Sequence, residues 1–237
     1  MCWSRKIQRS ISLRPRPLVP GGAFSELGAA SCADLESISM DFAFPCGVVL
    51  FHENTPGTQV LLIHSGRVKL YCTSRDDRTL LLKVAVPGDI LGLSAVVSRS
   101  PYEVTAITVA PTILRRVRGG PFRSFLATHV EASLLAAQTL SEAYRVAFAD
   151  VRRLALSGSS AARLAGVLLE WATAESVGKP EMRLTMALSH EDLGNLVGCS
   201  RETVTRTLGE FRRRKLIAIQ GASIRIPFPE KLGRIAA

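Results

Sequence analysis

The residues with the most distinctive chemistry are concentrated between positions 200 and 215. Arg201, Glu202, Thr205 and Arg206 fall within two turns of one another if this segment is helical. An arginine can donate two hydrogen bonds to O6 and N7 of guanine, and a glutamate can accept one from N4 of cytosine. Since phosphates would repel a carboxylate, Glu202 is best explained as a group that reads a base edge. These residue types predict a surface that contacts base pairs in the major groove.

Two helices and a short turn are predicted to hold this surface. Ser189 can cap a first helix, with Asp192 completing a capping box, and that helix should end near Val197. Gly198 then permits a left-handed turn. A second helix is predicted over residues 201–215, and its buried face consists of Val204, Leu208 and Phe211. Two helices joined in this way form a helix-turn-helix, whose second helix enters the major groove of DNA.

The segments beside the second helix complete the predicted DNA-binding surface. Ser200 can cap that helix, and Arg212 begins a basic run at its far end, where cations suit phosphates or the negative helix terminus. Two apolar stretches, 216–219 and 223–226, flank Gln220-Gly221-Ala222 and are typical of a hairpin, which would form a wing. The predicted DNA-binding residues are Ser200, Arg201, Glu202, Thr205, Arg206 and Arg212.

Two other patterns follow one another upstream of residue 157. From about 43 to 117, short apolar runs alternate with turn residues, which is typical of a small antiparallel barrel or sandwich. From about 121 to 156, apolar and small residues recur at alternating steps of four and three. This heptad pattern predicts a helix that pairs with a second copy of the chain. The predicted dimer seam consists of Val130, Ser133, Ala137, Leu140, Tyr144, Ala147 and Val151.

The run from Leu193 to Leu208 resembles the DNA-binding signature of the Crp/Fnr family of bacterial transcription regulators. Pro87-Gly88-Asp89-Ile90-Leu91-Gly92 resembles a turn motif of that family's cyclic nucleotide-binding-like domain. The resemblance implies an α+β chain with an N-terminal antiparallel β-roll, a long dimerisation helix and a C-terminal winged helix-turn-helix. It also implies that Arg201, Glu202 and Arg206 contact bases in a two-fold symmetric duplex.

The chain is therefore expected to divide into four parts. Residues 1–24 are predicted to form a basic, disordered tail, because their composition offers little to bury. Residues 25–120 would form the β-roll sensor, residues 121–156 the dimerisation helix, and residues 157–237 the DNA-binding domain. Small residues around Gly158 predict a hinge before the last domain.

The sensor departs from the family's cyclic-AMP-binding branch. That branch carries Gly-Glu-Leu and then Arg-Ser/Thr-Ala, whose glutamate holds the ribose and whose arginine pairs with the phosphate. Here Leu93 and Val104 occupy those two positions, so we expect no cyclic AMP binding of that kind. The cysteines also lack the close spacing of the iron–sulfur branch, whereas haem stays open because a single ligand leaves no spacing pattern. The expected pocket for an unidentified small-molecule effector consists of Gly92, Leu93, Ser94, Arg99, Glu103, Val104 and Thr105.

Charge and hydropathy limit the remaining classes of function. The chain has 30 lysines and arginines against 20 acids, a net charge of +10, which attracts polyanions. No stretch approaches the roughly 20 consecutive apolar residues that a membrane span needs, and no apolar segment follows the basic N-terminus. We therefore expect a cytoplasmic protein whose partners are double-stranded DNA, a second copy of the chain and RNA polymerase.

Two alternatives from other classes stay open. A cupin-like, metal-dependent β-barrel enzyme would need a His-x-His pair and a carboxylate, whereas His52 and His64 stand apart. A ligand-binding module without DNA binding would explain the sensor but not the presence of Arg201, Glu202 and Arg206 together. The expected protein is thus a regulator with no catalytic activity, no metal and no predicted cofactor.

Overall fold

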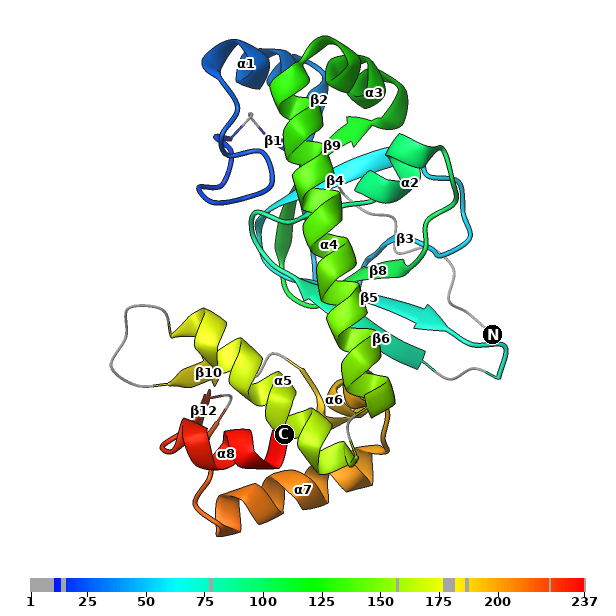
Figure 1. Cartoon of the computed structure of the whole chain (residues 1–237). Helices are drawn as coiled ribbons and strands as arrows, with labels where there is room; N and C mark the ends of the chain where they lie inside the picture. Colours follow the sequence, from blue (N-terminus) through cyan, green and yellow to red (C-terminus); the bar gives the residue numbers. More distant parts are fainter. Residues whose placement is uncertain are drawn as a thin grey trace. The chain divides into compact units, whose positions relative to one another are not determined.

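The computed structural model of the chain describes residues 11–13, 16–76, 79–156, 158–176, 182–185, 188–221 and 223–236. It divides into two compact units (Figure 1). Residues 1–74 and 82–144 form the first unit, and residues 75–81 and 145–237 form the second. The main boundary therefore falls inside helix α4 (Val130–Leu156), not at residue 157 as predicted.

An ion pair joins the last turns of α4 to the helix that follows. Arg153 donates from Nη1 to Glu170 of helix α5 (Ser160–Glu175) at 2.8 Å and also pairs with Asp150. This contact links the two helices on either side of Gly158. Ser157, which the sequence placed in the same hinge, lies outside the described residues.

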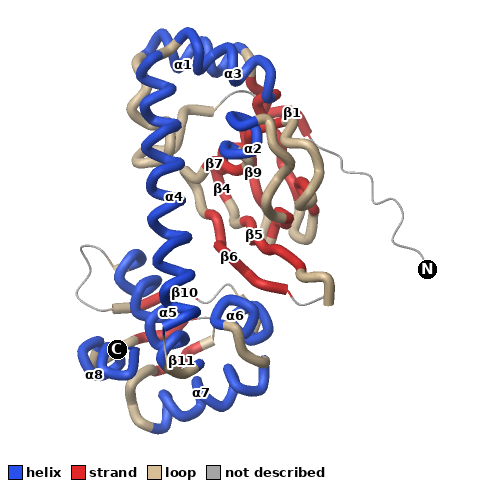
Figure 2. The backbone as a smooth tube through the Cα atoms, turned by 45° about the vertical axis from the view of Figure 1, so that its right-hand side comes forward, coloured by secondary structure: helices blue, strands red, loops and turns tan. Residues whose placement is uncertain are grey.

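Two antiparallel sheets make up the N-terminal β-roll (Figure 2). The larger has the strand order β1-β2-β9-β4-β7, and the smaller has the order β3-β8-β5-β6. Their strands are β1 (Ile11–Leu13), β2 (Ser39–Phe44), β3 (Val49–Phe51), β4 (Gln59–Ser65), β5 (Val68–Thr73), β6 (Thr79–Ala85), β7 (Ile90–Leu91), β8 (Thr105–Thr108) and β9 (Thr112–Arg118). The α+β fold with an N-terminal antiparallel β-roll is confirmed.

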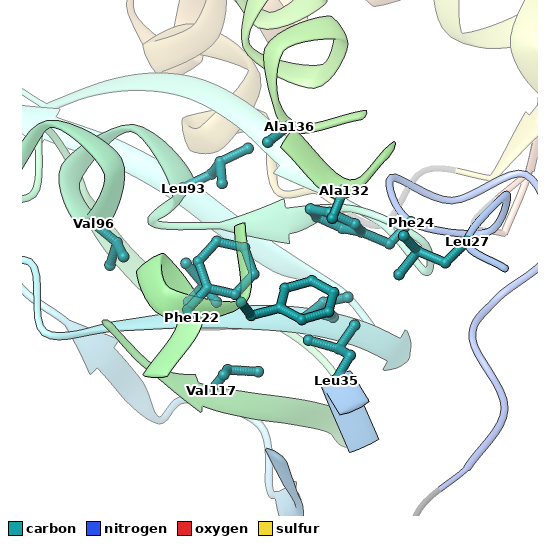
Figure 3. Close-up of a cluster of buried hydrophobic side chains, with 12 residues drawn as sticks. Phe24, Leu27, Leu35, Leu93, Val96, Val117, Phe122, Ala132 and Ala136 are labelled. Atoms are coloured by element: carbon teal, nitrogen blue, oxygen red, sulfur yellow. The ribbon is translucent and has the colours of Figure 1, made fainter. Parts of the chain in front are cut away.

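Strand β4 separates two hydrophobic cores, because successive side chains of a strand point to opposite faces. Leu61 and Ile63 belong to the core between the two sheets, where the rings of Phe51 and Tyr102 stack at 4.0 Å between centroids. Val60 and Leu62 join a second cluster on the other face. Figure 3 shows this second cluster, which is covered by helices α1 (Ala29–Ser37), α2 (Leu93–Ser98), α3 (Gly119–Thr128) and the first turns of α4.

The structure contradicts the prediction of a disordered tail at residues 11–13 and 16–24, the part of the tail that it describes. Phe24 is 1% exposed and belongs to the second cluster, where its ring meets that of Phe122 edge-on at 6.0 Å (Figure 3). Ile11–Leu13 pair with β2 as an edge strand. The prediction failed because burial of one phenylalanine in a proline- and arginine-rich segment depends on distant contacts. Residues 1–10, 14 and 15 lie outside the described residues.

The long helix predicted over residues 121–156 is two helices, α3 and α4, separated at His129. The backbone there is extended, with φ −119° and ψ 98°, and the amide of His129 still donates to the carbonyl of Phe125. Its ring holds the break, since Nε2 lies 3.1 Å from Asp34 of α1. The break lets α3 cover β9 while Ala132 and Ala136 of α4 enter the second cluster.

The second unit is a winged helix-turn-helix. Its elements are α5, β10 (Arg183–Thr185), α6 (His190–Val197), α7 (Arg201–Arg213), β11 (Ala218–Gln220), β12 (Ser223–Arg225) and α8 (Pro229–Ala236). The strands form one antiparallel sheet in the order β10-β12-β11. The predicted helices and hairpin are confirmed, although Ala222 of the wing lies outside the described residues. β10 and α8 were not predicted.

Candidate nucleic-acid interface

The start of α6 is held by the predicted capping box. The Ser189 hydroxyl accepts from the amide of Asp192 at 3.1 Å, and the Asp192 carboxylate accepts from the amide of Ser189 at 3.2 Å. The helix ends at Gly198, whose φ of +66° is the left-handed conformation that favours glycine. Both ends of α6 therefore follow from local sequence signals.

Helix α7 has one buried and one exposed face. Ser200 caps it by accepting from the amide of Thr203 at 3.2 Å. Val204 is 0% exposed, and Leu208 and Phe211 are 2% exposed, so the apolar side is fully covered by the rest of the second unit. The exposed side carries the predicted base readers and the basic end of the helix, namely Arg201, Glu202, Thr205, Arg206 and Arg212. The structure brings these residues together on one surface.

Hydrogen bonds in the first two turns of α7 involve two residues of this surface, Glu202 and Thr205. Hydrogen bonds from the amide of Glu202 and from the Ser200 hydroxyl lower the pKa of the Glu202 carboxyl. It is therefore ionised at neutral pH and can only accept hydrogen bonds. The Thr205 hydroxyl donates to the carbonyl of Arg201 at 2.9 Å, and Nδ1 of His190 lies 2.8 Å from the oxygen of that hydroxyl. Sequence reasoning missed His190, because a partner fifteen residues away has no periodic signal.

The predicted effector-pocket residues differ in their burial and surroundings. Leu93 is 4% exposed in the second cluster, whereas Val104 packs against the core between the sheets. Gly92 directly precedes α2 with φ +73°. Thr105 is buried, and its hydroxyl accepts from the amide of Glu53 at 3.1 Å. The other three, Ser94, Arg99 and Glu103, are exposed.

Much of the predicted dimer seam is exposed on α4. Val130 is 84% exposed, Tyr144 70% and Val151 61%, and Ser133, Ala137 and Ala147 are also exposed. Leu140 differs, because it is half-buried against the second cluster. Leu134 and Phe148, one position along from Ser133 and Ala147, are 59% and 57% exposed. At these two places the exposed apolar stripe of α4 therefore runs through Leu134 and Phe148, one residue after the predicted seam positions.

The described ranges offer neither a metal site nor a membrane span. No group of three histidine, cysteine, aspartate or glutamate side chains in them lies close enough to hold a metal ion. No helix in the same ranges is long and apolar enough to cross a membrane.

Comparison with known proteins gives two family models that match the chain. The Crp-like helix-turn-helix domain matches residues 162–235, and the cyclic nucleotide-binding domain matches residues 42–129. A CRP-like cAMP-activated global transcriptional regulator from Mycobacterium tuberculosis is 29% identical over 222 residues, which cover 92% of this chain and 98% of the relative. The transcriptional activatory protein AadR from Rhodopseudomonas palustris is 25% identical over 217 residues, which cover 90% of this chain and 87% of that relative.

The fold has close counterparts among solved structures. FixK2 from Bradyrhizobium japonicum superimposes with a TM-score of 0.75 at 20% identity, covering 84% of this chain and 98% of that one. The β-roll and the winged helix-turn-helix, the two matching family models and relatives aligned over nearly the whole chain lead to one conclusion: the chain belongs to the Crp/Fnr family of transcription regulators.

Proposed function

We propose that the chain is a cytoplasmic, homodimeric regulator without catalytic activity, whose α7 helices enter the major groove at the two halves of a palindromic site. The observation that carries this proposal is the exposed face of α7. Arg201, Glu202 and Arg206 lie there with base-reading chemistry, opposite a fully buried apolar face. The net charge of +10 adds a general attraction for the phosphate backbone. We further propose that the protein partner at the promoter is RNA polymerase.

The dimer supplies the symmetry of the site. Two copies joined along the exposed apolar stripe of α4 would present two recognition helices related by a two-fold axis. Half-sites for such dimers lie about 34–36 Å apart, which is one turn of the double helix. This spacing predicts an operator whose two halves are read on the same side of the duplex.

A selection experiment tests the proposal with random DNA, so no operator sequence has to be assumed. The purified protein is mixed with a pool of random duplexes, and the enriched sequences are read. We expect a palindrome, which then binds more tightly than a shuffled duplex of the same composition in fluorescence anisotropy at every salt concentration tested. Equal binding of both duplexes that fades steeply with salt would mean phosphate attraction alone and would contradict the proposal.

A Glu202→Ala variant should relax the choice of one base pair in each half-site. Loss of the carboxylate removes the acceptor for a cytosine amino group, which is worth about 1–3 kcal/mol of discrimination. The measurement is the affinity for single-base variants of the selected palindrome. Glu210→Ala is the matched control, because Glu210 is an exposed carboxylate near the other end of α7, where it pairs with Arg214 at 3.6 Å. Unchanged selectivity in Glu202→Ala would contradict the assigned role.

The β-roll is proposed to respond to an effector other than cyclic AMP bound in the usual way. The name of the mycobacterial relative records activation by cyclic AMP, but here Leu93 is packed in a core and Val104 cannot pair with a phosphate. No cofactor is proposed. The alternative of a cupin-like enzyme lacks support, because its two candidate histidines lie in different environments: His52 is exposed, whereas the side chain of His64 is 7% exposed beside Asp41.

Cyclic AMP at millimolar concentration should leave the melting temperature of the protein unchanged. A ligand at 100 times its Kd stabilises the folded state by about 2.7 kcal/mol, so even weak binding would give a measurable rise. The measurement is a thermal shift with and without the nucleotide, with adenosine as the control. A saturable rise specific to cyclic AMP would contradict this prediction, and a Soret absorption band in the purified protein would identify haem as the cofactor.

A further inference from the structure

A single arginine outside the predicted DNA-binding surface holds the end of α6. Arg163, in the first turn of α5, donates from Nε to the carbonyl of Val197 at 2.6 Å and from Nη2 to the carbonyl of Gly198 at 3.4 Å. The last carbonyls of a helix have no partner within it, and a cation there also meets the negative end of the helix dipole. The half-buried guanidinium therefore caps α6 from a neighbouring helix.

The segment that Arg163 holds is the turn that starts the recognition helix. Helices α5, α6 and α7 all contact one another (Figure 2). Within the turn, the amide of Cys199 donates to the carbonyl of Gly194 at 2.9 Å, and a Cβ on Gly194 would lie only 2.6 Å from the carbonyl oxygen of Cys199. Burial raises the pKa of the Cys199 thiol, which Arg163 partly opposes. A turn this closely packed transmits the position of the α6 end directly to Ser200 and the start of α7.

Arg163 also lies shortly after Gly158 in the chain. Ser159 caps α5 by accepting from the amide of Ala162 at 3.1 Å, and its carbonyl accepts from the amide of Arg163 at 3.1 Å. The first turn of α5 is thus tied to the residue that directly follows Gly158. The position of this first turn therefore sets the position of the Arg163 guanidinium and of the turn that it holds.

We propose that Arg163 is a positioning residue for DNA recognition, which links α5 to the first turn of α7 and sets the placement of Arg201 and Glu202 without touching DNA. The inference rests on the proposed function and adds the residue that controls its geometry. Recognition requires base-reading groups to be held within about 0.5 Å of the productive geometry. Loss of the cap should therefore weaken sequence discrimination more than it weakens general attraction to DNA.

The test compares Arg163→Met, which keeps the apolar stem and removes every donor, with Arg163→Lys, which keeps the charge and one donor direction. Arg234→Met, an exposed arginine of α8, is the matched control for the change in charge. The probes are the palindrome that the unaltered protein selects and its shuffled counterpart. We expect the ratio of their affinities to fall about tenfold in Arg163→Met, to recover in part in Arg163→Lys and to stay unchanged in Arg234→Met.

The salt dependence separates positioning from direct contact. If Arg163 touched a phosphate, the slope of log K against log salt would shrink by about one unit, and affinity for both duplexes would fall together. That result, or an unchanged affinity ratio, would overturn the proposal. Absence of any selected palindrome with the unaltered protein would instead count against the proposed function.

A measurement without DNA tests the placement by itself. Amide hydrogen exchange at Cys199 reports the turn, because its donor bond to Gly194 closes the end of α6. We expect faster exchange there in Arg163→Met and not in Arg234→Met, at temperatures where both variants are folded. If Arg163→Met does not fold, the same comparison is made with Arg163→Lys, whose exchange at Cys199 should be faster than in the unaltered protein. Unchanged protection in a folded variant would overturn the positioning role.

Discussion

A Phe148→Glu variant will be monomeric, and its affinity for the selected palindrome will fall by about 100-fold to 10,000-fold, because two half-sites can no longer be engaged together. Phe148 is 57% exposed and shares one stripe of α4 with Tyr144 and Val151. Exposed apolar surface of this extent is typical of an interface. A carboxylate placed in such a seam loses its hydration and gains no charged partner, and this desolvation costs on the order of several kcal/mol.

The matched control is Ala149→Glu, which adds the same charge to an exposed position beside the stripe. Light scattering gives the mass of each variant, and anisotropy gives its affinity for the palindrome. Leu140→Glu would be a poor test, because Leu140 packs partly against the second cluster and its loss would also disturb folding of the first unit. A dimeric Phe148→Glu protein, or a monomer that binds the palindrome as tightly as the unaltered chain, would show that the stripe is not the dimer interface.

The helix-turn-helix was predictable in detail because its signals are local. Ser189 and Ser200 cap helices by accepting from amides three residues further along, and Gly198 follows α6 in the left-handed conformation that glycine favours. The apolar spacing of Val204, Leu208 and Phe211 then separates the buried face of α7 from the exposed one. Each of these features depends on residues within one or two turns, so no tertiary information was needed.

Features that depend on distant contacts were not predictable. Phe24 enters a core whose partners include Phe122, about a hundred residues away. His129 breaks a helical pattern with the help of Asp34 on α1. The heptad frame was ambiguous for a related reason. Large apolar side chains occur at neighbouring positions such as Leu134 and Leu135, and only the packed first unit shows that Leu135 faces inward while Leu134 is exposed.

No local sequence signal indicates the role of Arg115. An arginine in a strand is usually exposed, yet Arg115 of β9 is 0% exposed and lies directly opposite Asp41 of β2. Its Nε donates to Asp41 at 3.0 Å, and its Nη2 donates to the carbonyl of Arg16. The amide of Arg16 donates in turn to Asp41 at 3.0 Å. This buried pair therefore holds the N-terminal segment against the β-roll.

Asp41→Ala will destabilise the first unit by about 3–5 kcal/mol, because it removes the buried partner of the Arg115 guanidinium and leaves only the partly exposed carboxylate of Glu36, 3.8 Å away, as a counter-charge. In calorimetry the transition of the first unit should fall by roughly 10 °C, since about 1 kcal/mol moves the melting temperature of a domain of this size by several degrees. The control is Glu36→Gln, whose carboxylate is 42% exposed and 3.8 Å from Arg115, and which should cost less than about 1 kcal/mol.

The double variant Asp41→Leu with Arg115→Leu separates the loss of the pair from the burial of a lone charge. Apolar replacement of both members of a buried pair is often close to neutral, so the double variant should be more stable than Asp41→Ala. Proteolysis of the segment around Arg16 should nevertheless be faster in it, because both hydrogen bonds to the Arg16 backbone are lost. If the double variant is instead as unstable as the single one, the cost comes from lost packing, and the buried pair is not what stabilises this part of the β-roll.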